Sequence, residues 1–152
     1  MGKRVEIKES AASQELRRIQ SRGLLQAERR GVRLIYRPVA DSQVASAAPL
    51  LKAIQAAVAA FPAERDEEMA VIAAGLAHER RVRIVRILME GRQTPLDLQF
   101  AAKITPHPFR AHMATLLASG FVVRSGAEVQ FAVPDHPLAK ALSKLIRQGA
   151  KR

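Results

Sequence analysis

The apolar positions between residues 105 and 133 change their spacing once, at Gly120. Before it, Met113 and Leu116 follow Phe109 at intervals of four and three residues, which is the spacing of one face of a helix. After it, apolar residues alternate with more polar ones on both sides of a turn at residues 124–127; they are Phe121, Val123, Val129, Phe131 and Val133. The pattern predicts a helix that ends at Gly120 and leads directly into a β-hairpin.

This helix is expected to begin at Thr105. A threonine hydroxyl can accept a hydrogen bond from a free N–H of the first turn, and Pro106 and Pro108 fit early helical positions. Its outward side carries small and basic residues, namely Arg110, Ala111, Ala114 and Thr115. Such a helix can enter a major groove while a basic hairpin beside it follows the phosphate backbone, which is the geometry of a winged helix.

In the second half of the chain, three more helices are predicted before this one and another after the hairpin. Apolar spacing places the first near residues 69–76 and the second from about His78 to Gly91, and Thr94 opens a short third helix that reaches Ala102. The short helix, a tight turn and the helix from Thr105 then make a helix-turn-helix. A final helix is expected from residues 135–137 onwards.

The first half repeats the order of helix, glycine and hairpin. Ser10 or Ser13 is expected to cap a helix that runs to Gly23, and a basic turn at residues 29–31 divides the hairpin after it. At an offset of 97, Leu16-x2-Ile19-x3-Gly23-Leu24-Leu25 matches Met113-x2-Leu116-x3-Gly120-Phe121-Val122. At an offset of 95, Gly31 and Tyr36 match Gly126 and Phe131. We predict two copies of one unit whose hairpins differ by two residues at the tip, the alternative being a loose match between unrelated amphipathic segments.

The remaining segments complete the predicted organisation. Residues 3–9 suit a short strand through Val5 and Ile7, and an alanine-rich helix is expected within residues 46–61. The apolar stripe of that helix suits either an internal core or a dimer interface, and it consists of Leu51, Ile54, Val58 and Phe61. A charged linker follows from Pro62, so the expected domains are residues 1–62 and 63–152.

Composition narrows the choice of partner. A formal charge of +11 and a pI of about 11.2 favour polyanions, nucleic acid before an anionic membrane. With no tryptophan and only 4% aromatic residues, duplex DNA is a better prediction than single strands. The chain has no cysteine, no apolar run of about 20 residues and no signal-peptide pattern at its start, so we expect a cytoplasmic protein without membrane contact.

Three stretches resemble the ArsR-type winged-helix transcriptional regulators of prokaryotes. LAHERRVRIVRILMEG (residues 76–91) looks like their opening helix, TPHPFRAHMATLLASGFV (residues 105–122) like their recognition helix, and GLLQAERRGVRLIYRPV (residues 23–39) like their wing. The resemblance covers residues 66–148, and residues 13–61 as a partial unit. It implies a mainly α fold with small β-hairpins (α+β), built as a tandem winged helix-turn-helix whose first unit is truncated, and a homodimer that binds operator DNA.

The resemblance does not extend to a metal sensor. Many members of the family sense metal through cysteines or paired histidines, whereas this chain has no cysteine and its four histidines show no ligand-like spacing. We therefore expect neither metal nor cofactor. No nucleophile elbow, phosphate-cradling glycine loop or catalytic carboxylate pair is present in the sequence, so an enzyme is not expected either.

The predicted DNA contacts fall on three segments. The residues are Thr105, His107, Arg110 and Ala111 in the first turns of the recognition helix, Arg124 in the second hairpin, and Arg29, Arg30 and Arg33 in the first. For each of them the alternative is an ordinary solvated surface, and His112 is expected to face inward. The sequence thus predicts a sequence-specific duplex DNA-binding regulator, with a winged-helix protein-interaction module that has lost DNA binding as the alternative.

Overall fold

The computed structural model describes residues 8–149, so the predicted strand around Val5 and Ile7 lies outside the described residues. Contacts between residues divide the chain into two compact units, unit 1 up to Ala63 and unit 2 from Glu64. None of the helices between residues 8 and 149 is long and apolar enough to cross a membrane.

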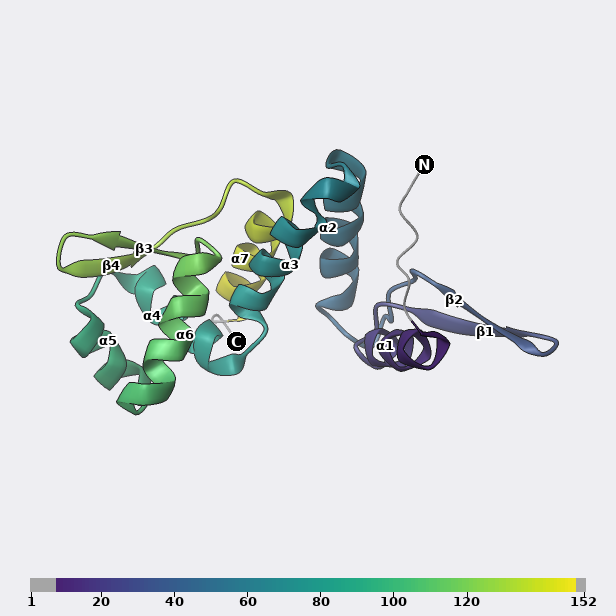
Figure 1. Ribbon diagram of the computed structural model, residues 1–152, viewed down its shortest axis with the longest axis horizontal. Helices are drawn as coiled ribbons and strands as arrows, with labels where there is room; N and C mark the ends of the chain where they lie inside the picture. Colours follow the sequence, from purple (N-terminus) through teal and green to yellow (C-terminus); the bar gives the residue numbers. More distant parts are fainter. Residues whose placement is uncertain (1–7, 150–152) are drawn as a thin grey trace. The chain divides into compact units, whose positions relative to one another are not determined.

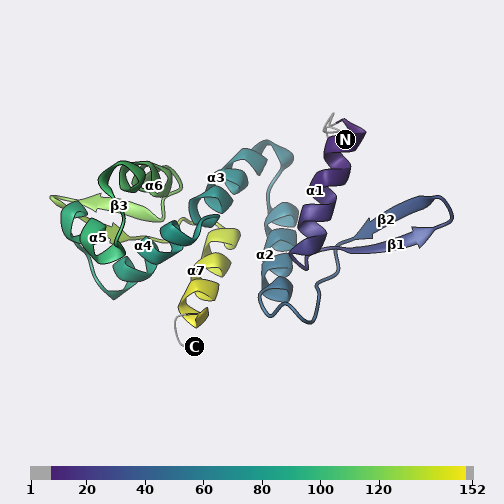
Figure 2. The ribbon, with the colours of Figure 1, turned by 90° about the horizontal axis from the view of Figure 1, so that it is seen from below.

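Unit 2 is a winged helix-turn-helix (Figures 1 and 2). Its elements are α3 (Asp66–Leu76), α4 (Glu79–Glu90), α5 (Pro95–Ala102), α6 (Pro106–Ala118), β3 (Val122–Ser125), β4 (Glu128–Phe131) and α7 (Pro137–Gly149). The strands β3 and β4 pair antiparallel, and Gln93 adds a backbone bridge to Val129. α5 and α6 form the helix-turn-helix, and the β3–β4 hairpin is the wing beside α6. The predicted fold class, mainly helical with small hairpins, is confirmed.

Side-chain caps explain where two of these helices begin. The Thr94 hydroxyl accepts a hydrogen bond from the Asp97 N–H at 3.2 Å, and His78 Nδ1 accepts one from the Arg80 N–H at 3.1 Å. Thr105 occupies the N-cap position of α6 as predicted, but its side chain makes no capping bond. The reason is local, because the third helical position, a usual donor to a cap, is Pro108, which has no N–H.

The turn between α5 and α6 is closed by the backbone of Lys103. This residue has a left-handed conformation with a φ of 53°, and the N–H groups of Lys103 and Ile104 donate to the carbonyls of Phe100 and Gln99. That pair of bonds is the Schellman arrangement that ends many helices, usually with glycine at the left-handed position. It turns the chain sharply, buries Ile104 and leaves Lys103 exposed.

The core of unit 2 lies between α4, α5, α6 and the hairpin. Its largest fully buried apolar side chains are Phe121, Ile84, Leu98, Leu116, Val85, Val122 and Val129. Phe109 and Met113 are also buried, which confirms the predicted inward face of α6. Phe131 is only half-buried, and the Arg147 guanidinium lies 6.0 Å from the centre of its ring.

The alternation predicted through Phe121 and Val123 was wrong by one residue. Val122 pairs with Phe131 and Arg124 with Val129, so Val122 shares the inward face with Val129, whereas Val123 pairs with Gln130 on the other face. The alternation begins at Val122 because Phe121 still belongs to the turn after Gly120 and is buried there rather than in the strand.

Unit 1 contains a helix, a hairpin and a second helix. Its elements are α1 (Glu9–Ser21), β1 (Gln26–Arg30), β2 (Arg33–Arg37) and α2 (Ala47–Ala60). α1 begins at Glu9 with Lys8 as N-cap, so the prediction that Ser10 or Ser13 caps it was wrong; both serines lie within the helix. The acidic Glu9 instead places a negative charge in the first turn, where the helix dipole favours one.

The two hairpins have the same tip. Gly31 and Gly126 have φ angles of 62° and 63°, and each is followed by one residue, Val32 or Ala127, before the chain returns. A two-residue turn with a positive φ only at its first position is typical of type II′, which favours glycine there. The two extra residues of the first hairpin therefore lie between Gly23 and Gly31, one in the connection before β1 and one in β1, and not at the tip as predicted.

Candidate nucleic-acid interface

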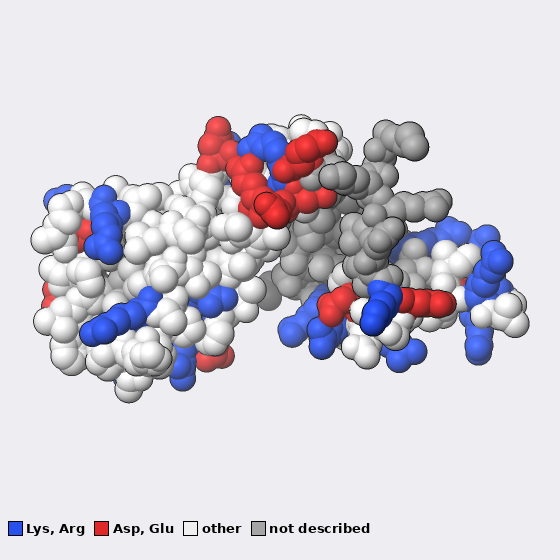
Figure 3. Space-filling view, viewed as in Figure 1, with Lys and Arg blue, Asp and Glu red and all other residues white. Residues whose placement is uncertain are grey.

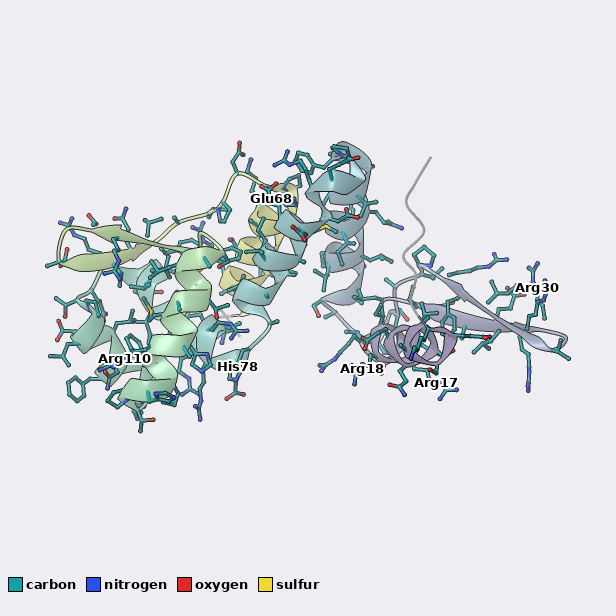
Figure 4. All side chains as sticks on the ribbon, viewed as in Figure 1. Arg17, Arg18, Arg30, Glu68, His78 and Arg110 are labelled. Carbon is teal, nitrogen blue, oxygen red and sulfur yellow. The ribbon has the colours of Figure 1, made fainter. Side chains whose placement is uncertain are left out.

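One side of α6 is packed and the other faces solvent. Phe109 and Met113 point into the core, whereas Thr105, His107, Arg110 and Ala111 are all exposed. Arg110 extends from the first half of the helix (Figure 4) and has no ion-pair partner among the described residues. His107, Arg110 and Ala111 are three and four residues apart and thus share one accessible side of α6, and Thr105 is exposed at the N-cap that precedes it.

Lys103 belongs to the same end of the helix-turn-helix and was missed by sequence reasoning. It is exposed at the turn that precedes Thr105, and its charge has no ion-pair partner within residues 8–149. The sequence signal that could have identified Lys103 is its position in the turn between a short helix and a helix that begins with proline. Nearby on α5, Leu96 and Phe100 are also exposed, at 61% and 70%.

The wing of unit 2 carries one cationic side chain, that of Arg124, which is available to bind a phosphate. Arg124 lies one residue pair before the closing pair Ser125–Glu128 and is exposed. Glu128 would counter a nearby phosphate, but Arg92 Nε lies 3.1 Å from its carboxylate and offsets its charge. Arg124 therefore keeps its positive charge at the wing without a described acidic partner.

The structure splits the arginine cluster of the first hairpin. Arg30 and Arg33 form the closing pair of β1 and β2 and share one face, whereas Arg29 pairs with Leu34 on the other. Glu28 binds Arg30 at 3.1 Å and Arg37 at 3.5 Å, which reduces the local charge. Residues 17–37 still hold seven arginines and a single acidic residue, and Figure 3 shows blue atoms gathered over this hairpin.

Acidic residues gather elsewhere, at the start of α3. They are Glu64, Asp66, Glu67 and Glu68, and they form the red area in Figure 3. Glu68 is partly neutralised by Arg65, whose Nη2 lies 2.6 Å from it. This surface would repel a phosphate backbone, whereas residues 98–127, which include α6, contain no acidic residue.

Two histidines that lie far apart in the sequence meet between α4 and α6. The ring centres of His78 and His112 are 4.6 Å apart, with His112 buried as predicted and His78 exposed at the start of α4. Burial lowers the pKa of His112 below its ordinary value of 6.5, and the positive charges of His78, Arg81 and Arg80 lower it further. No described group of three or more His, Cys, Asp or Glu residues could hold a metal ion.

Unit 2 is expected to lose stability as the pH falls from 7 to 5. The folded protein binds a proton at His112 less readily than the unfolded chain does, so the free energy of unfolding is highest above pH 6.5 and decreases below it. Urea unfolding at several pH values measures this slope. His112→Gln should flatten it, and His107→Gln, a change at an exposed histidine of the same helix, should leave it unchanged.

Comparison with known proteins finds a structural likeness. No protein-family profile matches the chain, and no curated protein matches it. A solved structure that is similar is the homodimeric winged helix-turn-helix DNA-binding domain (fragment 1–100) of a possible ArsR-family transcriptional regulator from Mycobacterium bovis. The identity is 22%, the match covers 60% of this chain and 90% of that one, and the TM-score is 0.46.

Proposed function

We propose that this chain is a transcriptional regulator that binds duplex DNA through α6 and the two hairpins. The observation that carries the proposal is that α6 has one buried and one exposed side. Phe109, Met113 and Leu116 pack the buried side into the core, and the exposed side carries small and basic residues. A rigid helix with one free side next to a wing is the arrangement that fits a major groove. Within this class, the stretches at residues 76–91 and 105–122 favour the ArsR type.

Each residue on the exposed side of α6 has a defined role in the proposal. Arg110 has a free guanidinium, which can donate two hydrogen bonds to the edge of a guanine. The Thr105 hydroxyl makes no capping bond and is available to a phosphate or a base. His107 can donate to the backbone, and the small Ala111 permits close approach to the bases.

The hairpins supply contacts that position the protein without reading sequence. In the proposal Arg124 and Lys103 bind phosphates on either side of α6, and Arg29, Arg30 and Arg33 bind phosphates at a second place on the duplex. The net charge of +11 adds long-range attraction. We further propose that the protein binds as a homodimer, which its solution mass with and without DNA would test.

Arg110→Ala is expected to remove most of the sequence preference. Preferred duplexes are first selected from a randomised library with the unaltered protein, and affinities for preferred and random duplexes are then compared. Loss of a bidentate contact to guanine should weaken the preferred duplex by about 1–3 kcal/mol while the random duplex changes little. Lys144→Ala, which removes one positive charge from α7, is the control and should leave the preference intact.

Two outcomes would contradict parts of the proposal. Equal weakening of preferred and random duplexes by Arg110→Ala would make Arg110 a phosphate contact. No binding to any duplex at micromolar protein and low salt would exclude DNA binding altogether. The second candidate function, a protein-interaction module, would then be favoured. Leu96 and Phe100 support it, because they expose an apolar surface on α5 that DNA binding in a groove does not require.

A further inference from the structure

Unit 1 contains an open apolar cavity of about 500 Å³. Its walls come from Ile19 of α1, from Leu24 and Leu25 after that helix, and from Leu51, Ile54 and Val58 of α2. Gln55 is its only polar lining residue. No residue of α1 is buried, and Ile19 and Val58 are 39% and 55% exposed. Three of the four residues of the apolar stripe predicted for this helix thus line a cavity instead of a closed core, the fourth being Phe61, and unit 1 leaves a sizeable apolar surface uncovered.

Unit 2 shows what fills the same place when the unit is complete. Gly23 and Gly120 end their helices with φ angles of 76° and 78°, so the two helix ends share their residue spacing and the conformation of their glycine. The counterparts of Ile19, Leu24 and Leu25 at the offset of 97 are Leu116, Phe121 and Val122, and these are 0–1% exposed. The cavity therefore corresponds to a site that is occupied in unit 2.

The occupant in unit 2 is α3, which packs against both α6 and α7. The contact is close, since a Cβ added to Gly75 would lie 2.7 Å from Ser119 Cβ and 3.0 Å from the Phe121 ring. Ile72 of α3 is buried in the same region. Among residues 8–63 no helix takes this place between α1 and α2. A helix that fills the cavity must therefore carry an apolar face with a very small residue where it approaches Leu24, the counterpart of Phe121.

Charge also defines the occupant. In unit 2, Arg81 donates to the carbonyls of Gly75 and Ala74 at 3.0 and 2.8 Å and so caps the end of α3. In unit 1, a groove that shares Ile19 and Leu24 with the cavity is bordered by Arg18 and Arg22. Arg22 corresponds to Ser119 at the offset of 97, so the C-terminal carbonyl groups of a docked helix would lie near Arg22. Cations there favour the negative end of a helix dipole.

We propose that this cavity binds an amphipathic α-helix of a partner protein that resembles α3. The helix has an acidic or neutral polar side and a glycine or alanine near its C-terminal end, which lies against Arg22. A second copy of the chain is a poor source, because it would have to withdraw its own α3 and expose Ile72 and Phe121. The surface is distinct from the exposed side of α6.

A peptide with the sequence of α3 provides the direct test. A fluorescently labelled peptide of residues 64–77, with four acidic residues and one arginine, is titrated with the full chain in the absence of DNA. We expect saturable binding in fluorescence anisotropy. Val58→Asp should weaken it at least tenfold without unfolding unit 1, because Val58 is already half-exposed. Leu96→Asp, the same kind of change at an exposed position of unit 2, should have no effect.

The peptide itself supplies a second control. Replacing its Gly75 with Leu should abolish binding, because the close approach seen in unit 2 leaves no room for a side chain. The proposal is overturned if the parent peptide does not bind at millimolar concentration, or if the Gly75→Leu peptide binds as well as the parent. It is also overturned if the Val58→Asp substitution in the protein leaves the affinity for the parent peptide unchanged. A fall in solution mass from dimer to monomer in Val58→Asp would also overturn it, since a second copy would then be the occupant.

Discussion

Raising monovalent salt from 50 to 200 mM is expected to weaken binding to a random duplex by about 500-fold. Five residues of the proposal would each neutralise a phosphate: Arg29, Arg30, Arg33, Lys103 and Arg124. Each contact releases about 0.9 counterions from B-DNA, so the logarithm of the affinity should fall with the logarithm of salt with a slope of about −4.5. Anisotropy titrations at four or five salt concentrations measure this slope.

The slope of affinity against salt also distinguishes arginines that contact phosphates from arginines that only attract DNA at long range. Replacing Arg30 and Arg33 with glutamine should flatten it by about 1.8, because two phosphate contacts are lost. Replacing Arg17 and Arg18 of α1 with glutamine removes equal charge from the same unit and should change the slope little. If the two double variants behave alike, the first hairpin attracts DNA without touching it. A slope near zero for the unaltered chain would contradict the proposed phosphate contacts as a whole.

The elements of unit 2 could be predicted from sequence because their signals are local. Apolar spacing, Thr94 before Pro95 and the glycine at 120 define a helix-turn-helix and a hairpin within a few residues of their observed bounds. The short turn needed no glycine, since Lys103 takes the left-handed conformation itself. Such signals depend only on neighbours in the chain, and they are preserved when the unit folds.

Features that depend on pairing or on distant partners could not be predicted. Arg29 and Arg30 are neighbours in β1 and lie on opposite faces, and the two-residue turn at Gly31 decides which of them shares a face with Arg33; a shift of one residue would have paired Arg29 with Arg33. The contact of His78 with His112 joins residues 34 positions apart on two helices. The cavity in unit 1 arises because other elements leave part of α1 uncovered, and the sequence of α1 alone cannot show this.

Phe121→Ala is expected to cost unit 2 about 3–5 kcal/mol of its free energy of unfolding. The ring is fully buried and contacts α3 at Gly75, and the residue's carbonyl accepts the Ala132 N–H at 3.0 Å. Truncation removes apolar contacts and leaves a void where the hairpin, α3 and α6 meet, in a unit with little room to collapse. For a domain of this size the melting temperature should fall by more than about 10 °C.

Two spectroscopic signals assign the loss to unit 2. Far-UV circular dichroism follows mainly the five helices of unit 2, whereas Tyr36, the only tyrosine in a chain without tryptophan, reports unit 1 by its fluorescence. The dichroism transition should move to lower temperature in Phe121→Ala. Phe100→Ala, at a ring that is 70% exposed, removes the same atoms and should change stability by no more than about 0.5 kcal/mol. Equal effects of the two substitutions would mean that Phe121 does not organise the core, and the packed side of α6, on which the orientation of Arg110 depends, would have to be reconsidered.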